Sequence, residues 1–169
     1  MHRGNIQRLN IGEVHFGFGL DPAVDDQLQR AAAQVNKTKQ SLLALDEAWQ
    51  LAPNRLEVLQ AQYKFHFYRG DLHKAEDFVF QTLIKAAIQG GFNHDWSTLN
   101  AGSADWRQAH GPARFFLYAL KALAFIRLRQ NMPKQAREIL DAMARIDPED
   151  QVGASVIRDL LAGLENPDD

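Results

Sequence analysis

The side chains of this sequence that could form a catalytic or metal-binding group are histidines and a carboxylate. His94, Asp95 and His110 fall in one polar stretch, and His66 precedes it. Three such ligands and a bound water could form a hydrolytic zinc site. Their spacing matches no zinc signature such as H-E-x-x-H. We therefore interpret them as polar loop residues and expect no metal, no other cofactor and no catalytic residue, with a hydrolase that uses these histidines as the less favoured alternative.

Composition and charge exclude several other kinds of site and partner. The chain of 169 residues has no cysteine, which excludes a thiol nucleophile, a thiolate metal site and a disulfide scaffold. Its net charge of −2 gives no electrostatic case for nucleic acid. The glycines at 17, 19, 90 and 91 form no phosphate-binding motif. No apolar run approaches the ~20 residues of a membrane span, and the first 20 residues lack the apolar core of a signal peptide. We expect a cytoplasmic protein that does not bind a membrane.

Two tryptophans stand in a stretch rich in Gly, Ser and Asn, from Phe92 to Gly111. Asp95-Trp96 recurs ten residues later as Asp105-Trp106. A long insertion of this kind packs across a neighbouring surface or serves function. We favour the interpretation that both rings pin the loop to the core. The alternative is that Trp96 and Trp106 form a secondary partner-binding surface, where tryptophan is enriched.

The elements that must position these residues are helical. Leu56 to Ala86 contains two apolar stripes at helical spacing around the turn Arg69-Gly70-Asp71. Gly70 can adopt the left-handed conformation that ends a helix, and Asp71 can cap the next one. Similar patterns predict further helices over residues 22–35, 38–51, 112–130, 133–148 and 150–164.

The last predicted helix carries an apolar face that comprises Val152, Val156, Ile157, Leu160 and Leu161. Such a helix would cover the exposed apolar edge of a helical array. Residues 1–20, with roughly alternating apolar positions, predict an arm that is extended or partly disordered. In the extended case, the arm would dock on the core or on a second copy of the protein.

The helical hairpins repeat. Their turn residues are Asn36, Gly70 and Asn131, and the first two lie 34 residues apart. Five residues after each turn comes a small residue, and eight residues after it an apolar one; these are Ser41, Ala75, Ala136, Ala44, Phe78 and Ile139. Small residues at fixed positions permit close helix crossings, and a period of 34 is a repeat signal.

These motifs resemble the tetratricopeptide repeat family, with repeats over about 22–53, 56–87 and 117–148. The best match is NMPKQAREILDAMARIDPED, Asn131 to Asp150. The resemblance implies an all-α fold: a right-handed superhelix of about three helix pairs and a C-terminal capping helix, in one domain over 21–169 with an insertion at about 92–111. Tyr63 stands where the family has a small residue, and repeat one has only Ala44 where a large apolar residue is usual. A generic helical bundle with accidental spacing is the alternative.

The family resemblance also implies a function. Its members bind peptides in a concave groove lined by the first helix of each repeat, which here corresponds to Arg30, Gln34, Gln60, Lys64, Phe67, Tyr68, Tyr118, Lys121, Phe125 and Arg129. Basic and aromatic side chains suit an acidic protein segment with apolar anchors. We expect a non-enzymatic adaptor or chaperone. The resemblance to the small tetratricopeptide chaperones of bacterial secretion systems concerns architecture only.

Two alternatives to that function remain open. The aromatic groove residues could belong to the core and the basic ones to a solvated face. The chain could also be a homodimeric structural subunit joined through Phe16 and Phe18 of its arm.

Overall fold

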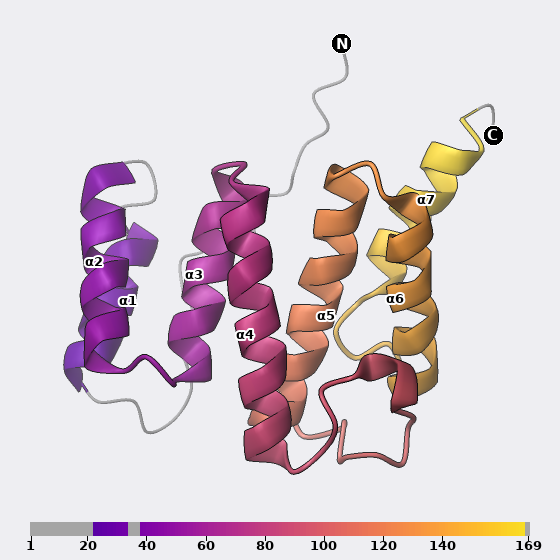
Figure 1. The fold of residues 1–169 in the computed structure, drawn as a ribbon, viewed down its shortest axis with the longest axis horizontal. Coiled ribbons are helices and arrows are strands. Elements are labelled where there is room, and N and C mark those ends of the chain that lie inside the picture. Colours follow the sequence, from indigo (N-terminus) through magenta and orange to yellow (C-terminus); the bar gives the residue numbers. More distant parts are fainter. Residues whose placement is uncertain (1–21, 34–37, 168–169) are drawn as a thin grey trace. The chain divides into compact units, whose positions relative to one another are not determined.

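Every regular element that the computed structural model describes, over residues 22–33 and 38–167, is a helix. Figure 1 shows the order, which is α1 (Pro22–Ala33), α2 (Thr38–Leu51), α3 (Leu56–Tyr68), α4 (Leu72–Gly90), the short 3₁₀ helix η2 (Trp96–Thr98), α5 (Pro112–Arg129), α6 (Pro133–Ile146) and α7 (Ser155–Glu165). The all-α prediction is confirmed. The predicted arm over residues 1–20 and the turn at Asn36 lie outside the described residues.

The chain divides into two compact units, Met1–Val58 and Leu59–Asp169. In the first unit, α1 and α2 pack against each other. The hydroxyl of Ser41 donates a hydrogen bond to the carbonyl of Ala31 at 3.4 Å. The buried side chains of this pair are small or branched: Val24, Leu28, Ala31, Ser41, Ala44, Leu45 and Ala48. Small residues on α2 let the two backbones approach closely.

The second unit contains two helical hairpins with the same turn. Gly70 has a φ of 81° and Asn131 a φ of 60°. The corresponding hydrogen bonds are Gly70 N to Phe67 O at 3.0 Å, Asp71 N to His66 O at 2.9 Å, Asn131 N to Leu128 O at 3.1 Å, and Met132 N to Arg127 O at 2.8 Å. Each pair of bonds forms a Schellman motif, which satisfies the last carbonyls of the preceding helix. The predicted left-handed turn at Gly70 is confirmed.

The side chains after each turn also correspond. Ala75 and Ala136, five residues past their turns, are fully buried. Asp71 caps α4 by accepting a hydrogen bond from the amide of Lys74 at 3.2 Å, as predicted. Met132 caps α6 without a side-chain bond, and Pro133 begins that helix. The chain therefore builds the two hairpins with one turn geometry and two different N-terminal caps.

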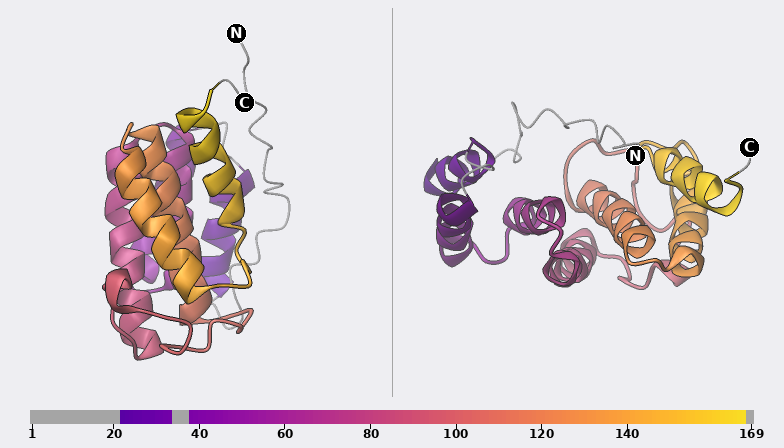
Figure 2. Two further views of the ribbon diagram at one scale, coloured as in Figure 1. Left: turned by 90° about the vertical axis from the view of Figure 1, so that its right-hand side faces the viewer. Right: turned by 90° about the horizontal axis from the view of Figure 1, so that it is seen from above.

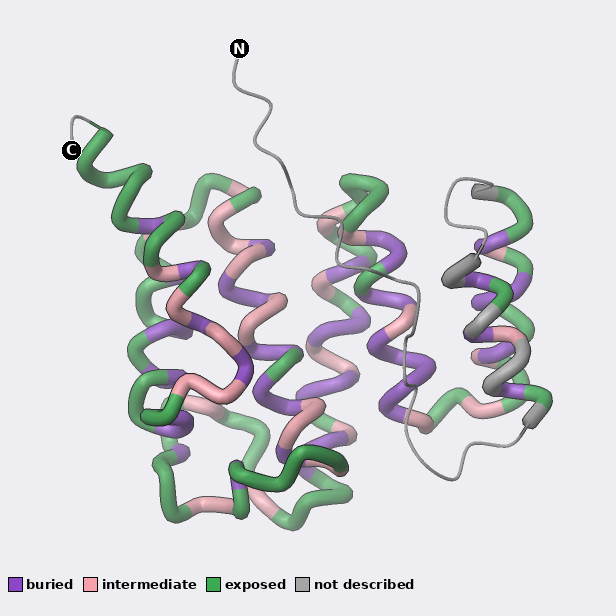
Figure 3. The backbone as a smooth tube through the Cα atoms, turned by 180° about the vertical axis from the view of Figure 1, so that it is seen from behind, coloured by how far each residue is buried: buried purple, intermediate pink, exposed green. Residues whose placement is uncertain are grey.

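Helix α5 is the centre of the second unit. It packs against α4, α6 and α7, and Figure 2 shows it between α4 and α6. Its fully buried side chains are Phe116, Leu117, Ala119, Leu120, Leu123, Ala124 and Ile126. In Figure 3, buried positions follow the sides of the helices that face their neighbours. A helix buried on this many sides is a rigid base for the side chains that it presents at the surface.

Helix α7 begins later than predicted and buries a narrower face. Asp150 and Gly153 have φ values of 53° and 72°, so the chain turns before Ser155. Ile157 and Leu161 are buried, whereas Val156 and Leu160 are 56% and 46% exposed. The prediction that the apolar side chains of the last helix share one buried face was wrong, because Val156 and Leu160 lie outside that face. Positions four apart share one side of a helix, and their immediate predecessors are rotated by about 100° onto another side.

Candidate functional site

An aromatic cluster joins α3 to α5 at the surface of the second unit. The ring of Phe67 lies 5.0 Å from that of Phe125 and 5.6 Å from that of Tyr68, between centroids. The guanidinium carbon of Arg129 lies 5.8 Å from the centre of the Phe67 ring. Phe67 and Phe125 are half-buried, and Tyr68 is exposed. The structure thus brings together three predicted groove aromatics and one predicted cation.

Lys64 lies one turn before Tyr68 on α3 and adds a second cation; the residue as a whole is exposed, so its desolvation concerns a group at the surface and not in the core. Desolvation first, and then the positive charge of Lys121, lower the pKa of Lys64. Among the described residues, no hydrogen bond or ion pair engages its ammonium. A cation held near apolar surface and another cation gains from an anion that binds beside it, because the anion offsets both unfavourable effects.

Lys121 has a different role from the one predicted for a groove cation. Its ammonium donates a hydrogen bond to the carbonyl of Val152 at 2.9 Å. Desolvation lowers its pKa, and the carboxylate of Asp150 acts in the opposite direction. The residue therefore ties the segment between α6 and α7 to the surface of α5. We name residues 147–154 the cap segment.

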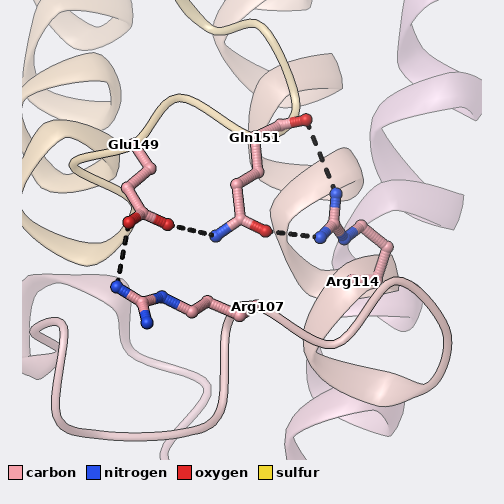
Figure 4. Close-up of polar contacts among 4 residues, drawn as sticks. All are labelled: Arg107, Arg114, Glu149 and Gln151. Carbon is pink, nitrogen blue, oxygen red and sulfur yellow. Dashed lines mark hydrogen bonds and ion pairs between the residues drawn. The ribbon is translucent and has the colours of Figure 1, made fainter.

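The cap segment is held by a further polar network that Figure 4 shows in full. Arg114, in the first turn of α5, donates to the side chain of Gln151 at 2.7 Å. Gln151 donates to Glu149 at 3.5 Å, and Glu149 forms an ion pair with Arg107 at 2.9 Å. Arg107 belongs to the insertion, so the network joins insertion, cap segment and α5. These bonds fix the position of the carbonyl that engages Lys121.

Buried polar groups lie beneath this surface. Tyr63 is 3% exposed, and Gln60 and Tyr118 are its neighbours. Burial raises the pKa of Tyr63, and the Gln60 side chain acts in the opposite direction. Gln60, a predicted groove residue, is itself buried, whereas Tyr118 is exposed. The large residue at position 63 is therefore accommodated in the core.

The remaining predicted groove residues belong to the first unit. Arg30 lies in the last turn of α1 and is exposed. Gln34 lies outside the described residues. The α3/α5 surface is accordingly defined by residues of the second unit alone, which are Lys64, Phe67, Tyr68, Tyr118, Lys121, Phe125 and Arg129.

The two insertion tryptophans have different environments. Trp106 is 4% exposed, and its indole donates to the carbonyl of Asn100 at 3.0 Å. Its ring lies 5.1 Å from Phe92 and 6.0 Å from Phe116. Trp106 thus pins the loop to the core, as the favoured interpretation states, and does not present its ring to a partner. Trp96 is half-buried and borders a surface cavity.

The histidines do not form one site. His66 is buried, with its ring stacked 5.6 Å from Phe78, whereas His94 and His110 are exposed in the insertion. In the part of the chain that the structure describes, no three His, Cys, Asp or Glu side chains come together as metal ligands. Within the same ranges, no helix combines the length and apolar character that a membrane span requires.

The sequence interpretation missed a cation beside the α3/α5 surface and two residues of the cavity beside Trp96. The guanidinium of Arg69 lies 5.6 Å from the Phe65 ring, next to the α3/α5 surface in the chain. Phe80 and Ile84 of α4 line the cavity beside Trp96. Their spacing of four residues places them on one helix face, but an identical spacing occurs at buried positions. The sequence held no signal that this face of α4 is exposed.

Comparisons with known proteins give one relative of low identity. The chain is similar to an "uncharacterized 19.8 kDa protein in nifW 5'region" of Azotobacter chroococcum mcd 1, with 26% identity over 160 residues that cover 94% of this chain and 89% of the relative. No family model matches the chain, and no solved structure matches it. The similarity extends over almost the whole length of both chains, and it carries no function to this one.

Proposed function

We propose that this protein is a non-enzymatic protein-binding module, an adaptor or chaperone of tetratricopeptide-like repeat architecture that presents the α3/α5 surface to an acidic segment of a partner. The repeat architecture is supported by the shared turn of the two hairpins and by the fully buried alanines, Ala75 and Ala136, at equivalent positions. The binding role rests on the side chains that α3 and α5 present.

The observation that carries the proposal is a cation, Lys64, on the same helix as the aromatic cluster and one turn before Tyr68. Lys64 has a lowered pKa and no bonded anion among the described residues, and Phe67, Phe125 and Arg129 lie on the adjacent turns of α3 and on α5. A carboxylate bound there would form charge-assisted hydrogen bonds, which are worth roughly 1.5–3 kcal/mol each. Half-exposed rings supply the apolar contact that anchors a neighbouring side chain.

The partner segment is expected to be acidic because the cations outnumber the anions on this surface. Lys64, Lys121 and Arg129 are its charged members, and Lys121 is engaged by the cap segment. Lys64 and Arg129 therefore have the main role in recognising a carboxylate. Binding through these groups should weaken at raised salt, since exposed charges are screened.

Site-specific photo-crosslinking tests the proposal. A photoreactive phenylalanine derivative replaces Tyr68 or Tyr118, which are 41% and 40% exposed, and Leu164 of α7 serves as the control at 65% exposure. Each full-length variant is irradiated in the native cell extract and analysed by mass spectrometry. We expect the first two positions to capture the same partner through an acidic segment. Capture of that partner from the control position alone would refute the assignment of the surface.

A further inference from the structure

A surface cavity of about 420 Å³ lies between α4 and the insertion, on residues outside the α3/α5 surface. Its lining residues are Phe80, Leu83, Ile84, His94, Asp95 and Trp96. The rings of Phe80 and Trp96 are nearly parallel, at 25°, with centroids 6.5 Å apart. That separation is near the upper end of the range for ring pairs, so the two rings are not tightly packed. We call this site the Trp96 cavity.

The insertion that forms one wall of the Trp96 cavity is firmly attached to α6. The guanidinium of Arg145 donates to three carbonyls, those of Leu99 at 2.9 Å, Trp96 at 3.3 Å and Ser97 at 3.3 Å. Leu99 is buried, 4% exposed. A site whose walls are fixed before binding loses less conformational entropy when a ligand enters.

Asp95 gives the cavity a negative charge. Its Oδ1 accepts hydrogen bonds from the amide of Ser97 at 3.0 Å and from the Ser97 hydroxyl at 2.6 Å. These bonds lower the pKa of Asp95 and keep it ionised. Within the described residues no hydrogen bond engages the other oxygen, Oδ2. Asp77, one turn before Phe80 on α4, is exposed and adds a second carboxylate near the same helix face.

Two basic side chains near the cavity, Arg127 and Lys85, have interactions elsewhere in the chain. The guanidinium of Arg127 lies 6.0 Å from the Phe80 ring, but it forms an ion pair with Glu76 at 2.5 Å. Lys85 follows Ile84 in α4 and is half-buried, with an interaction inside the chain. The cavity thus combines two aromatic rings with the carboxylate of Asp95, and His94 also lines it.

An apolar strip continues from the cavity along α4. Ile84 and Ile88 follow Phe80 at intervals of four residues and are 43% and 74% exposed. Positions at this spacing lie on one side of a helix. A partner that reached the cavity would also contact aliphatic surface next to it.

We propose that the Trp96 cavity binds an arginine side chain of a protein partner, within a segment that has aliphatic residues beside the arginine. A planar guanidinium can stack on the indole of Trp96 while it donates hydrogen bonds to Oδ2 of Asp95. Arginine suits the site better than lysine because its planar, weakly hydrated group can lie flat on the indole while an N–H at its edge donates to Oδ2 of Asp95. Tryptophan is the aromatic residue that interacts most strongly with a cation. Ile84 and Ile88 receive the aliphatic neighbours.

The test uses the full-length protein and N-acetyl-arginine amide as the probe. Titration is followed by the indole N–H signal of Trp96 and the methyl signals of Ile84 and Ile88 in two-dimensional NMR spectra. N-acetyl-citrulline amide, which is planar but uncharged, is the matched ligand control. We expect saturable shifts with the arginine probe and at least about five-fold weaker binding of the citrulline probe, because the cation–π and carboxylate interactions need the charge.

Two aspartate variants complete the test. Asp95→Asn removes the charge and keeps an oxygen that can accept from Ser97, and we expect it to weaken the arginine probe at least about five-fold. Asp105→Asn is the control, since Asp105 is exposed and precedes the buried Trp106. A circular dichroism spectrum like that of the parent shows that each variant keeps its fold.

Three results would overturn the proposal. They are equal binding of the arginine and citrulline probes, equal effects of the two aspartate variants, and tighter binding of N-acetyl-leucine amide than of the arginine probe. A Trp96→Leu variant guards against local rearrangement in Asp95→Asn, because it keeps the carboxylate and removes the ring. Retention of arginine binding by that variant would contradict the stacking role of Trp96.

Discussion

The left-handed turn at Gly70 predicts that a glycine-to-alanine change lowers the free energy of unfolding there, although the same change in a helix raises it. Gly70 has a φ of 81°, and a Cβ added there would meet no atom within 4 Å. The effect of Gly70→Ala is therefore a backbone effect alone. Left-handed backbone costs a non-glycine residue about 1–2 kcal/mol. Alanine recovers about 0.4–1 kcal/mol because it restricts the unfolded chain. We expect Gly70→Ala to lower the free energy of unfolding by about 1 kcal/mol.

Gly163 is the matched control for that change. It lies in the last turn of α7, its φ is not positive, and a Cβ added there also meets no atom within 4 Å. Alanine is favoured over glycine by about 0.8–1.0 kcal/mol in a helix interior, which is an upper bound for a residue in the last turn. The same chemical change should therefore raise the free energy of unfolding at position 163 and lower it at position 70.

The assay must report on the second unit alone. Trp49 lies in the first unit, so a Trp49→Phe background leaves Trp96 and Trp106 as the fluorescent probes of Leu59–Asp169. Urea unfolding at 25 °C gives the free energy for each variant. A stabilising Gly70→Ala, or effects of the same sign at positions 70 and 163, would refute the assigned turn.

Three further predictions concern packing, charge and the insertion. Ala75→Leu and Ala136→Leu should each lower the free energy of unfolding by about 1–3 kcal/mol through overpacking, as urea unfolding would show; two parent-like variants would contradict the equivalence of the hairpins. Lys64 should be acetylated faster than Lys134 at pH 8, as peptide mass spectrometry would measure, because its lowered pKa leaves more free amine; equal rates would contradict the desolvation of Lys64. Arg145→Ala should make residues 92–111 more susceptible to limited proteolysis, since it removes three hydrogen bonds to the loop; an unchanged cleavage rate would show that other contacts hold the insertion.

Local patterns predicted the helices of the second unit closely. The expected turn at Gly70, the cap at Asp71 and the starts at Pro112 and Pro133 all agree with the structure. Each depends on a short-range preference, such as the freedom of glycine or the fixed φ of proline, which acts in any tertiary context. The late start of α7 escaped prediction because Asp150 adopts a left-handed conformation that aspartate visits only when local hydrogen bonds support it.

The sequence predicted which residues belong to the candidate site, but it did not predict all of the contacts that these residues make. The family resemblance placed Phe67 and Phe125 among the groove residues, on the first helices of two repeats, and the structure brings their rings together. The sequence could not show that Lys121 bonds to the cap segment, because Val152 lies 31 residues away and offers only a backbone carbonyl. The buried position of Trp106 depends on Phe92 and Phe116 in the same way. Contacts of this kind follow from tertiary packing and not from local periodicity.

A calorimetric titration of the partner tests the role of the α3/α5 surface most directly. The partner captured by crosslinking is titrated into the parent, into Lys64→Ala/Arg129→Ala, and into the control Lys74→Ala/Lys134→Ala, whose exposed lysines lie on α4 and α6. Loss of one charge-assisted bond of roughly 1.5 kcal/mol weakens binding about ten-fold. We predict at least that loss for the first variant, a parent-like Kd for the control, and unchanged circular dichroism for both. A folded first variant that binds as tightly as the parent would contradict the proposed role of this surface.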